Sequence, residues 1–357
     1  MIKIQEHLNR ADAETFLDKI AENHWQSLNQ KLKNGRGFKS NSLIEKCRKY
    51  KTESSLKRYQ KKFGNNNPDE SKRHKYFFDY LLKSNASELK RLIVARPIEY
   101  PNIIENILKI LHPSDLYTGN PGNYSQTSFG LLLSKSIFNY TAFRASESCK
   151  DLFTEIGFNS VTCPYCNDNK MKIVKIKNNS STKTKQRAYL DLDHFYPKSQ
   201  NPFLAVSFFN LIPTCHDCNS SDKRDKPFTI ETHIHPYLEA FENFYKFKIS
   251  LKTLLGDTLD NIEILKLAGR PKDITLDDLE LVARYNSNLD IAKNLVTFFM
   301  NNKHYIGTKD EMIFTEAIFT LNGGVPKRRE DILKIQKGKM SRDILMQIDI
   351  NNILGIK

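Results

Sequence analysis

Two closely spaced pairs of cysteines constrain this chain more than any other feature of its sequence. The first pair lies in CPYC (163–166) and the second in CHDC (215–218), with residues 167–214 between them. A spacing of two residues lets both thiolates of a pair turn toward one ion, and two such pairs complete a tetrahedral set of sulfur ligands. Redox dithiols do not usually come as matched pairs. We therefore predict a structural zinc ion bound by Cys163, Cys166, Cys215 and Cys218.

The composition excludes several classes of protein. The 357 residues include 55 Lys and Arg against 41 Asp and Glu, a formal net charge of +14, and 22 Phe and 15 Tyr can fill an interior. Global disorder is therefore excluded. We find no run of the roughly 18 to 20 uncharged apolar residues that a membrane helix needs, and no apolar signal-peptide centre. Six cysteines are too dilute for a disulfide scaffold, so we expect a cytoplasmic protein without a membrane partner.

Between and after the cysteine pairs lie the residues that indicate chemistry. AYLDLDHFYPKS (188–199) predicts a strand that contains Asp193 and His194, and FLAVSFFNLIPTCHDCN (203–219) places Asn210 just before a second strand. A histidine titrates near pH 6.5 and can deprotonate water. Neighbouring residues of an ideal strand point to opposite faces, so Asp193 and His194 can serve one phosphate only where the strand ends or bends.

Residues 163–223 resemble an HNH endonuclease of the zinc-knuckle type, in which a ββα-metal core holds one catalytic divalent ion. By position, His194 matches the general base and Asp193 the metal-binding acid. Asn210 matches the asparagine that orients the histidine loop. Asn219 takes the third motif position, where many members have histidine, so the chain resembles the HNN subtype. The resemblance implies a hydrolase that cuts DNA, with Mg²⁺ or Mn²⁺ on Asp193 and Asn219 stabilising the leaving group.

The extended pattern CPYC, LDHFYPKS and FNLIPTCHDCN is also similar to the nuclease subunits of bacterial anti-phage defence systems, including the Septu type. In that type the nuclease works with an ATPase partner. The sequence contains no GxxxxGK[ST] phosphate loop, so nucleotide-driven control would have to come from another protein. The resemblance therefore implies antiviral defence and an ATPase subunit as a partner.

A run of cations without acids lies beside the motif, at residues 170–187. Met171, Ile173, Val174 and Ile176 alternate with the lysines, which predicts a hairpin with a turn over 178–182. Such a ribbon can contact the phosphate backbone without reading bases; an edge strand protected by lysines is the structural alternative. The predicted nucleic-acid-binding residues are Lys172, Lys175, Lys177, Lys183, Lys185, Arg187 and Lys223.

The predicted fold is α+β, with a small zinc-stapled ββα-metal core at 150–236. A basic helical region (1–120) precedes it and binds substrate or partner, and a mainly helical region (237–357) follows. Residues 119–128 read as a linker or surface loop. The apolar spacing further predicts helices over 131–149 and 276–301 and strands over 244–251 and 261–267.

Two other functions remain open from the sequence. One is a noncatalytic zinc-ribbon module that only binds nucleic acid. The other is an RNA-cutting toxin with the same core, because the metal chemistry acts on phosphate and the 2′-hydroxyl is read elsewhere. We expect His233 and His235 to be structural. Cleavage specificity, activating signal and oligomeric state have no signature in the sequence.

Overall fold

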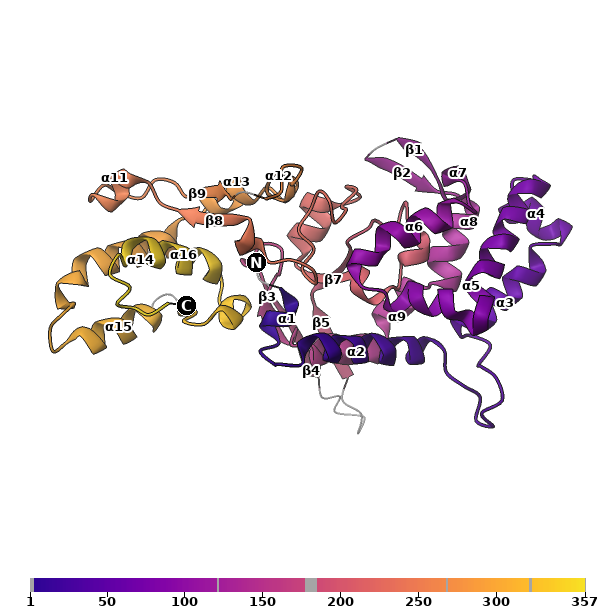
Figure 1. Cartoon of the computed structure of the whole chain (residues 1–357), viewed down its shortest axis with the longest axis horizontal. Helices are drawn as coiled ribbons and strands as arrows, with labels where there is room; N and C mark the ends of the chain where they lie inside the picture. Colours follow the sequence, from indigo (N-terminus) through magenta and orange to yellow (C-terminus); the bar gives the residue numbers. More distant parts are fainter. Residues whose placement is uncertain (1–2, 121, 177–184, 268, 321–322, 357) are drawn as a thin grey trace.

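The computed structural model describes residues 3–120, 122–176, 185–267, 269–320 and 323–356. Within these ranges helices predominate over small antiparallel sheets, which confirms the α+β class. Figure 1 shows an elongated molecule with the helices of residues 43–108 toward one end and the C-terminal elements at the other, while the first helices lie near the middle. The strands with the sequence motifs lie between them. In the described part of the chain, no helix combines the length and apolarity needed to cross a bilayer.

The N-terminal part is built around the long helix α5 (Pro68–Val94). Asn67 caps it and Pro68 occupies its first turn, as both residue types favour at a helix start. The helix is interrupted at residues 83–86, where the backbone leaves helical geometry. Its buried face packs against α2 (Ala13–Leu28) and α3 (Leu43–Glu53). The other elements here are α1 (Ile4–His7), α4 (Lys57–Phe63), η1 (Pro97–Glu99), α6 (Tyr100–Leu108) and α7 (Pro113–Leu116).

The segment 119–128 is not an open linker. It forms most of a hairpin of β1 (Tyr117–Asn120) and β2 (Asn123–Gln126). Gly119 has a φ of +102°, and a Cβ there would clash with the carbonyl oxygen of Asn123, so this position in β1 requires glycine. The side-chain amide of Gln126 donates to the carbonyl of Lys198 at 2.7 Å. The hairpin is thereby joined to the loop that follows the predicted catalytic histidine.

Both long helices predicted from the sequence are broken. Asn139 and Ser146 each accept a hydrogen bond from a backbone N–H three residues later, so each starts a new helix rather than continuing one. Glu280 interrupts the other stretch with a φ of +52°. The elements found are α8 (Ser128–Leu131), η2 (Leu132–Ile137), α9 (Tyr140–Ala145) and α10 (Glu147–Glu155), and then α12 (Thr275–Asp278), α13 (Leu281–Asn286) and α14 (Asp290–Asn302).

Two small sheets carry the motifs. A three-stranded sheet has the order β3-β4-β5, with β3 (Ser160–Thr162), β4 (Lys170–Ile176) and β5 (Lys185–Tyr189) antiparallel. A separate hairpin pairs β6 (Asp191–His194) with β7 (Leu211–Thr214), and the helical segment η5 (Asp217–Lys223) follows it. The short helices η3 (Pro202–Leu204) and η4 (Phe208–Asn210) lie between β6 and β7. Both arms of the predicted hairpin are present; its turn over 178–182 lies outside the described residues.

The C-terminal part contains the two strands expected there. They are β8 (Tyr245–Lys248) and β9 (Glu263–Lys266), which pair antiparallel. Helix α16 packs on β8 and on α14. The remaining elements are η6 (Phe241–Asn243), α11 (Leu251–Leu254), η7 (Lys303–Tyr305), α15 (Glu311–Thr320), η9 (Arg329–Lys334) and α16 (Gly338–Ile348).

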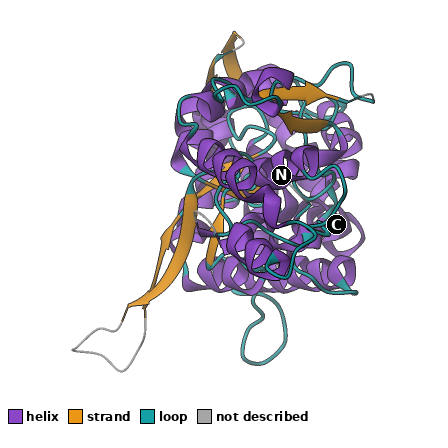
Figure 2. Cartoon of the chain, turned by 90° about the vertical axis from the view of Figure 1, so that its left-hand side faces the viewer, coloured by secondary structure: helices purple, strands orange, loops and turns teal. Residues whose placement is uncertain are grey.

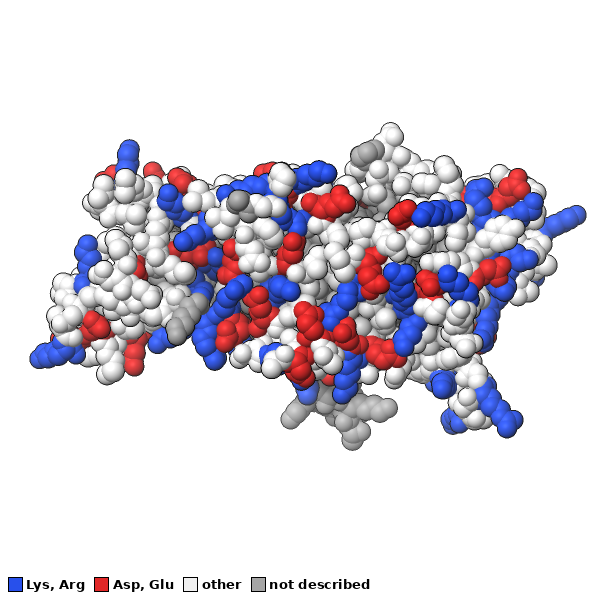
Figure 3. Space-filling model, in the orientation of Figure 1, with Lys and Arg blue, Asp and Glu red and all other residues white. Residues whose placement is uncertain are grey.

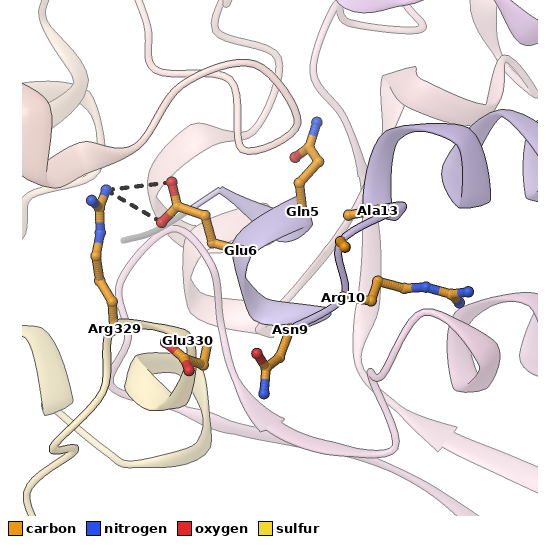
Figure 4. A pocket seen from close by; sticks show the side chains of 8 residues that line it. Gln5, Glu6, Asn9, Arg10, Ala13, Arg329 and Glu330 are labelled. Carbon is orange, nitrogen blue, oxygen red and sulfur yellow. Dashed lines mark hydrogen bonds and ion pairs between the residues drawn. The ribbon is translucent and has the colours of Figure 1, made fainter.

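The beginning of the chain packs against its C-terminal part. The N–H of Ile4 donates to the carbonyl of Pro236 at 3.0 Å, and α1 contacts η9. A cavity of about 560 Å³ lies at this seam. Figure 4 shows Glu6 and Arg329, two of the residues that line it, joined as an ion pair with 3.3 Å between their charged atoms. None of the predicted site residues lines this cavity, so we regard it as part of the packing between the two segments.

Candidate active site and metal centre

The four paired cysteines come together. All four side chains are buried, and their sulfur atoms lie within 4.8 Å of one another. The Cys166 and Cys215 sulfurs are 3.9 Å apart. One pair follows β3 and the other follows β7, so the cluster joins the three-stranded sheet to the β6–β7 hairpin. This arrangement could hold a zinc ion, as the spacing predicts.

Helix α13 lies against the cysteine cluster. The Arg284 guanidinium donates to the sulfur of Cys218 at 3.1 Å and to the carboxylate of Asp222 at 2.7 Å. The Tyr285 hydroxyl donates to the carbonyl of Cys166 at 2.6 Å. Hydrogen bonds from the neighbouring thiols, with the charge of Arg284, hold the pKa of Cys166 well below its usual value. No pattern in the sequence indicates these contacts, because α13 is more than 60 residues away along the chain.

His194 ends β6 and is held from two sides. Its Nε2 lies 3.0 Å from the carbonyl oxygen of Ala205, and the ring of Tyr140 packs edge-on at 4.5 Å between centroids. A carbonyl only accepts hydrogen bonds, so Nε2 carries the proton and Nδ1 keeps a lone pair. Burial, reinforced by the charge of Lys198, lowers the pKa of His194 to about 3. The imidazole is therefore neutral at pH 7, with its lone pair on Nδ1.

Asn210 fixes the loop that follows His194. Its amide oxygen accepts from the N–H of Tyr196 at 2.8 Å, and its amide nitrogen donates to the carbonyls of Tyr196 and Leu204 at 3.1 and 3.3 Å. The side chain is fully buried. All three partners are backbone groups of the loop between β6 and β7. They tie together both ends of the loop whose Ala205 carbonyl orients His194.

Asp193 lies on the other face of β6 and is buried, with 2% of its surface exposed. Its Oδ2 accepts from the Tyr165 hydroxyl at 2.8 Å, and its Oδ1 lies 2.9 Å from the ammonium of Lys223. The same ammonium donates to the carbonyl of His194 at 2.8 Å. Lys223 is thus buried rather than exposed as expected for a phosphate contact. The reason is electrostatic, because a buried carboxylate without a cation is strongly unfavourable.

Asn219 contacts a different aspartate from the one expected. Its amide nitrogen donates to Oδ2 of Asp191 at 3.2 Å, and Nδ1 of His216 lies 3.2 Å from the same oxygen. Asp191 and His216 line a cleft of about 680 Å³ beside Asp217. The sequence analysis did not identify Asp191 or His216 as candidate site residues. The alternation in LDLDH, however, already placed Asp191 on the same face of the strand as Asp193.

Oxygen donors are present near the motif, but the structure brings Asn219 to Asp191 and not to Asp193. Two carboxylates, Asp191 and Asp193, and the amide of Asn219 come from a strand and from the helical segment that follows it. Oxygen donors of this kind suit Mg²⁺ or Mn²⁺. Each carboxylate oxygen offers two lone pairs, so Asp193 can bind an ion while it keeps Tyr165 and Lys223 as partners.

The basic ribbon of β4 and β5 projects from the body of the molecule (Figure 2). The register Lys172↔Tyr189, Val174↔Arg187 and Ile176↔Lys185 places three cations on one face, with Lys175 on the opposite face. These four side chains are exposed, and within the described residues none forms an ion pair. Lys177 and Lys183 lie outside the described residues. On the face in Figure 3, by contrast, cations and acids are interspersed among uncharged residues.

His233 and His235 are buried in packing contacts. His233 stacks on Phe228 and bonds Asp278 at 2.9 Å. His235 packs against Phe195, with ring centroids 4.2 Å apart. Their positions agree with the structural role expected for both.

Comparison with known proteins gives a partial similarity. Over 79 residues the chain is 34% identical to protein ea31 of Escherichia phage lambda, which covers 22% of this chain and 21% of ea31. The chain thus matches about a fifth of that protein's length. No family model matches the chain. No solved structure matches it either.

Proposed function

We propose that this chain is a metal-dependent endonuclease of the HNH type that hydrolyses phosphodiester bonds in DNA. The observation that carries the proposal is the environment of His194. Its neutral imidazole lies at the end of a strand and is oriented by the Ala205 carbonyl, which belongs to a loop that Asn210 holds by hydrogen bonds. The hairpin that carries it is joined to a cluster of four cysteines. A rigid base of this kind suits the activation of water.

In the proposed reaction, the Nδ1 lone pair of His194 takes a proton from the attacking water. General-base catalysis of this type typically contributes about 10² to 10⁴ in rate. Tyr140 and the Ala205 carbonyl restrict rotation of the ring, so the base keeps one direction. Lys223 acts as a positioning residue, because it holds the β6 strand end through both Asp193 and the His194 carbonyl.

A divalent ion, Mg²⁺ or Mn²⁺, is assigned to Asp193 and Asn219, with Asp191 as a further acid beside them. When bound, such an ion supplies charge stabilisation at the phosphate and the departing oxygen. The ribbon cations Lys172, Lys185 and Arg187 bind the phosphate backbone of the substrate. We further propose that the protein acts in the cytoplasm, in anti-phage defence, with an ATPase subunit as its partner.

The test is plasmid cleavage with Mg²⁺ or Mn²⁺, with and without the product of the neighbouring gene. His194→Ala is compared with wild type and with His304→Ala, which removes an exposed histidine in the C-terminal part. We expect His194→Ala to lose at least 100-fold in rate and His304→Ala to cut normally. A parallel arm with RNA of the same sequence distinguishes an RNA-cutting toxin.

A noncatalytic binding module is the second candidate, and the exposed cations of the ribbon favour it independently of His194. If wild-type protein retains DNA but cuts nothing under any of these conditions, the nuclease proposal fails and the binding module stands. Cutting by His194→Ala at the wild-type rate would also overturn the role given to this residue.

A further inference from the structure

A second group of potential metal ligands lies in the N-terminal part, away from the HNH-like motif. Glu70 and His74 are one turn apart on α5, so their side chains share a face of the helix. Asp115 comes from α7 and meets them there. One ligand atom from each residue lies within 4.8 Å of the others, and the three residues are 6%, 0% and 1% exposed.

His74 has the strongest indication of a missing ligand. Its Nδ1 lies 3.2 Å from the Tyr59 hydroxyl, and its ring stacks on Phe129 with 3.5 Å between centroids. The ring is therefore fixed in orientation. Its Nε2 is buried and has no hydrogen-bond partner among the described residues. An unsatisfied buried nitrogen is costly, whereas a histidine oriented by a hydrogen bond at its other nitrogen is the usual arrangement of a metal ligand.

The two carboxylates retain capacity for an ion. Asn65 donates to both oxygens of Glu70, at 3.1 and 3.3 Å. On Asp115, Oδ2 accepts from Arg73 and from the His112 N–H, but Oδ1 accepts from Arg73 alone among the described contacts. Because a carboxylate oxygen has two lone pairs, one on Oδ1 is left for a metal.

The electrostatic balance of the cluster also favours a cation. Two carboxylates face one guanidinium, that of Arg73, while burial keeps His74 neutral. Burial, together with the nearby charge of Asp115, raises the pKa of Glu70. A divalent cation would offset this repulsion between the two acids, and Arg73 would continue to orient Asp115.

We propose that Glu70, His74 and Asp115 bind one divalent transition metal ion, with Zn²⁺ as the ion that suits the site. Zn²⁺ accepts imidazole and carboxylate ligands together, whereas Mg²⁺ and Ca²⁺ prefer oxygen alone. The ion has a structural role: it fastens α7 to α5 and, through Tyr59, to α4. This proposal is independent of the nuclease activity.

The experiment counts metal by cobalt substitution of the full-length protein. Cobalt in the cysteine cluster gives thiolate-to-metal charge-transfer absorption, and cobalt at this site gives ligand-field bands without it. Wild type is compared with Glu70→Gln and with Asp79→Asn, a control that removes a partly exposed carboxylate from the same helix. We expect Glu70→Gln to lose one cobalt equivalent while the thiolate band is unchanged, and Asp79→Asn to lose none.

The expected difference of one equivalent does not depend on whether the HNH-like motif also binds cobalt, since that contribution is the same in all three proteins. If Glu70→Gln binds as much cobalt as wild type, the proposal is overturned. His74→Gln provides the second variant and should behave as Glu70→Gln does. If His74→Gln does not fold, Glu70→Gln still decides, because glutamine preserves the volume of the side chain and one oxygen for Asn65.

Discussion

The cysteine cluster and the Asp193–His194 motif share the β6–β7 hairpin, but the surroundings of their donor atoms differ. In the cluster, four sulfur atoms lie together within 4.8 Å, and thiols are weak partners for one another. In the motif, Asp193 has Lys223 and Tyr165, and His194 has the Ala205 carbonyl. The four sulfurs could therefore hold an ion between them, whereas Asp193 and Nε2 of His194 already have partners within the protein.

If the chain is the nuclease proposed above, this difference would separate an ion that stabilises the fold from an ion that takes part in the reaction. Structural zinc contributes folding free energy directly. An ion bound at a motif whose groups already have partners adds little to stability and can exchange. We therefore expect zinc removal to unfold the central region, and removal of Mg²⁺ or Mn²⁺ to abolish cutting while the fold remains.

The largest predicted effect is that of Cys166→Ser. Loss of one thiolate removes zinc, whose binding contributes on the order of 10 kcal/mol in small zinc domains. We expect no cooperative unfolding transition of the central region by circular dichroism and no bound zinc by elemental analysis. Cys149→Ala, a buried cysteine outside the cluster, should stay folded with its zinc. A folded, zinc-free Cys166→Ser protein would refute the structural role of the ion.

The next effect in size concerns the partner of Asp193. Lys223→Met leaves the buried carboxylate without its cation, which typically destabilises a protein by about 3–5 kcal/mol. Asp193→Asn in the same chain should recover part of this loss, because no charge is then left buried. Urea unfolding of the two single variants and the double variant measures both quantities. Equal stability of Lys223→Met and wild type would mean that the ion pair does not hold β6 to η5.

The parts of the site that the sequence predicted rest on short-range geometry. The two-residue spacing within each pair sets the direction of the thiolates, and Asn210 reaches Tyr196 because strand pairing brings their segments together. The missed contacts depend on tertiary placement. Arg284 meets Cys218 from 66 residues away, and His24 meets Val206 from 182 residues away. Periodicity alone could not show such partners, and it likewise missed the helix breaks at Asn139 and Ser146.

The third prediction concerns His24, which links helix α2 to the loop between β6 and β7. Its Nε2 lies 2.8 Å from the carbonyl of Val206, the neighbour of the Ala205 carbonyl that orients His194. Burial lowers the pKa of His24 to about 4, against about 6.5 in an unfolded chain. The unfolded state thus binds the proton more tightly, so the free energy of unfolding is full above pH 6.5 and falls between pH 6.5 and 4.

The expected loss from His24 is about 3 kcal/mol over that interval. Urea unfolding at several pH values measures it in wild type and in His24→Gln, which should show a shallower decline below pH 6.5. His112→Gln, at an exposed histidine, is the matched control and should follow wild type. If the free energy of unfolding of wild type and of His24→Gln depended on pH in the same way, the loss of stability below pH 6.5 would not come from protonation of His24.

The smallest predicted effect tests which face of the ribbon would contact DNA in the proposed complex. Arg187→Gln removes a cation from the face that carries Lys172 and Lys185, while Lys175→Gln removes an equally exposed cation from the opposite face. Removal of one cation that touches a phosphate should lower the slope of log Kobs against log salt by about 0.9. We expect this change for Arg187→Gln alone, measured by fluorescence anisotropy over a salt series. A similar change in both variants would mean that DNA contacts both faces of the ribbon. An unchanged slope in both variants would mean that DNA does not contact the ribbon, so that the β6–β7 hairpin would have to bind the substrate without it.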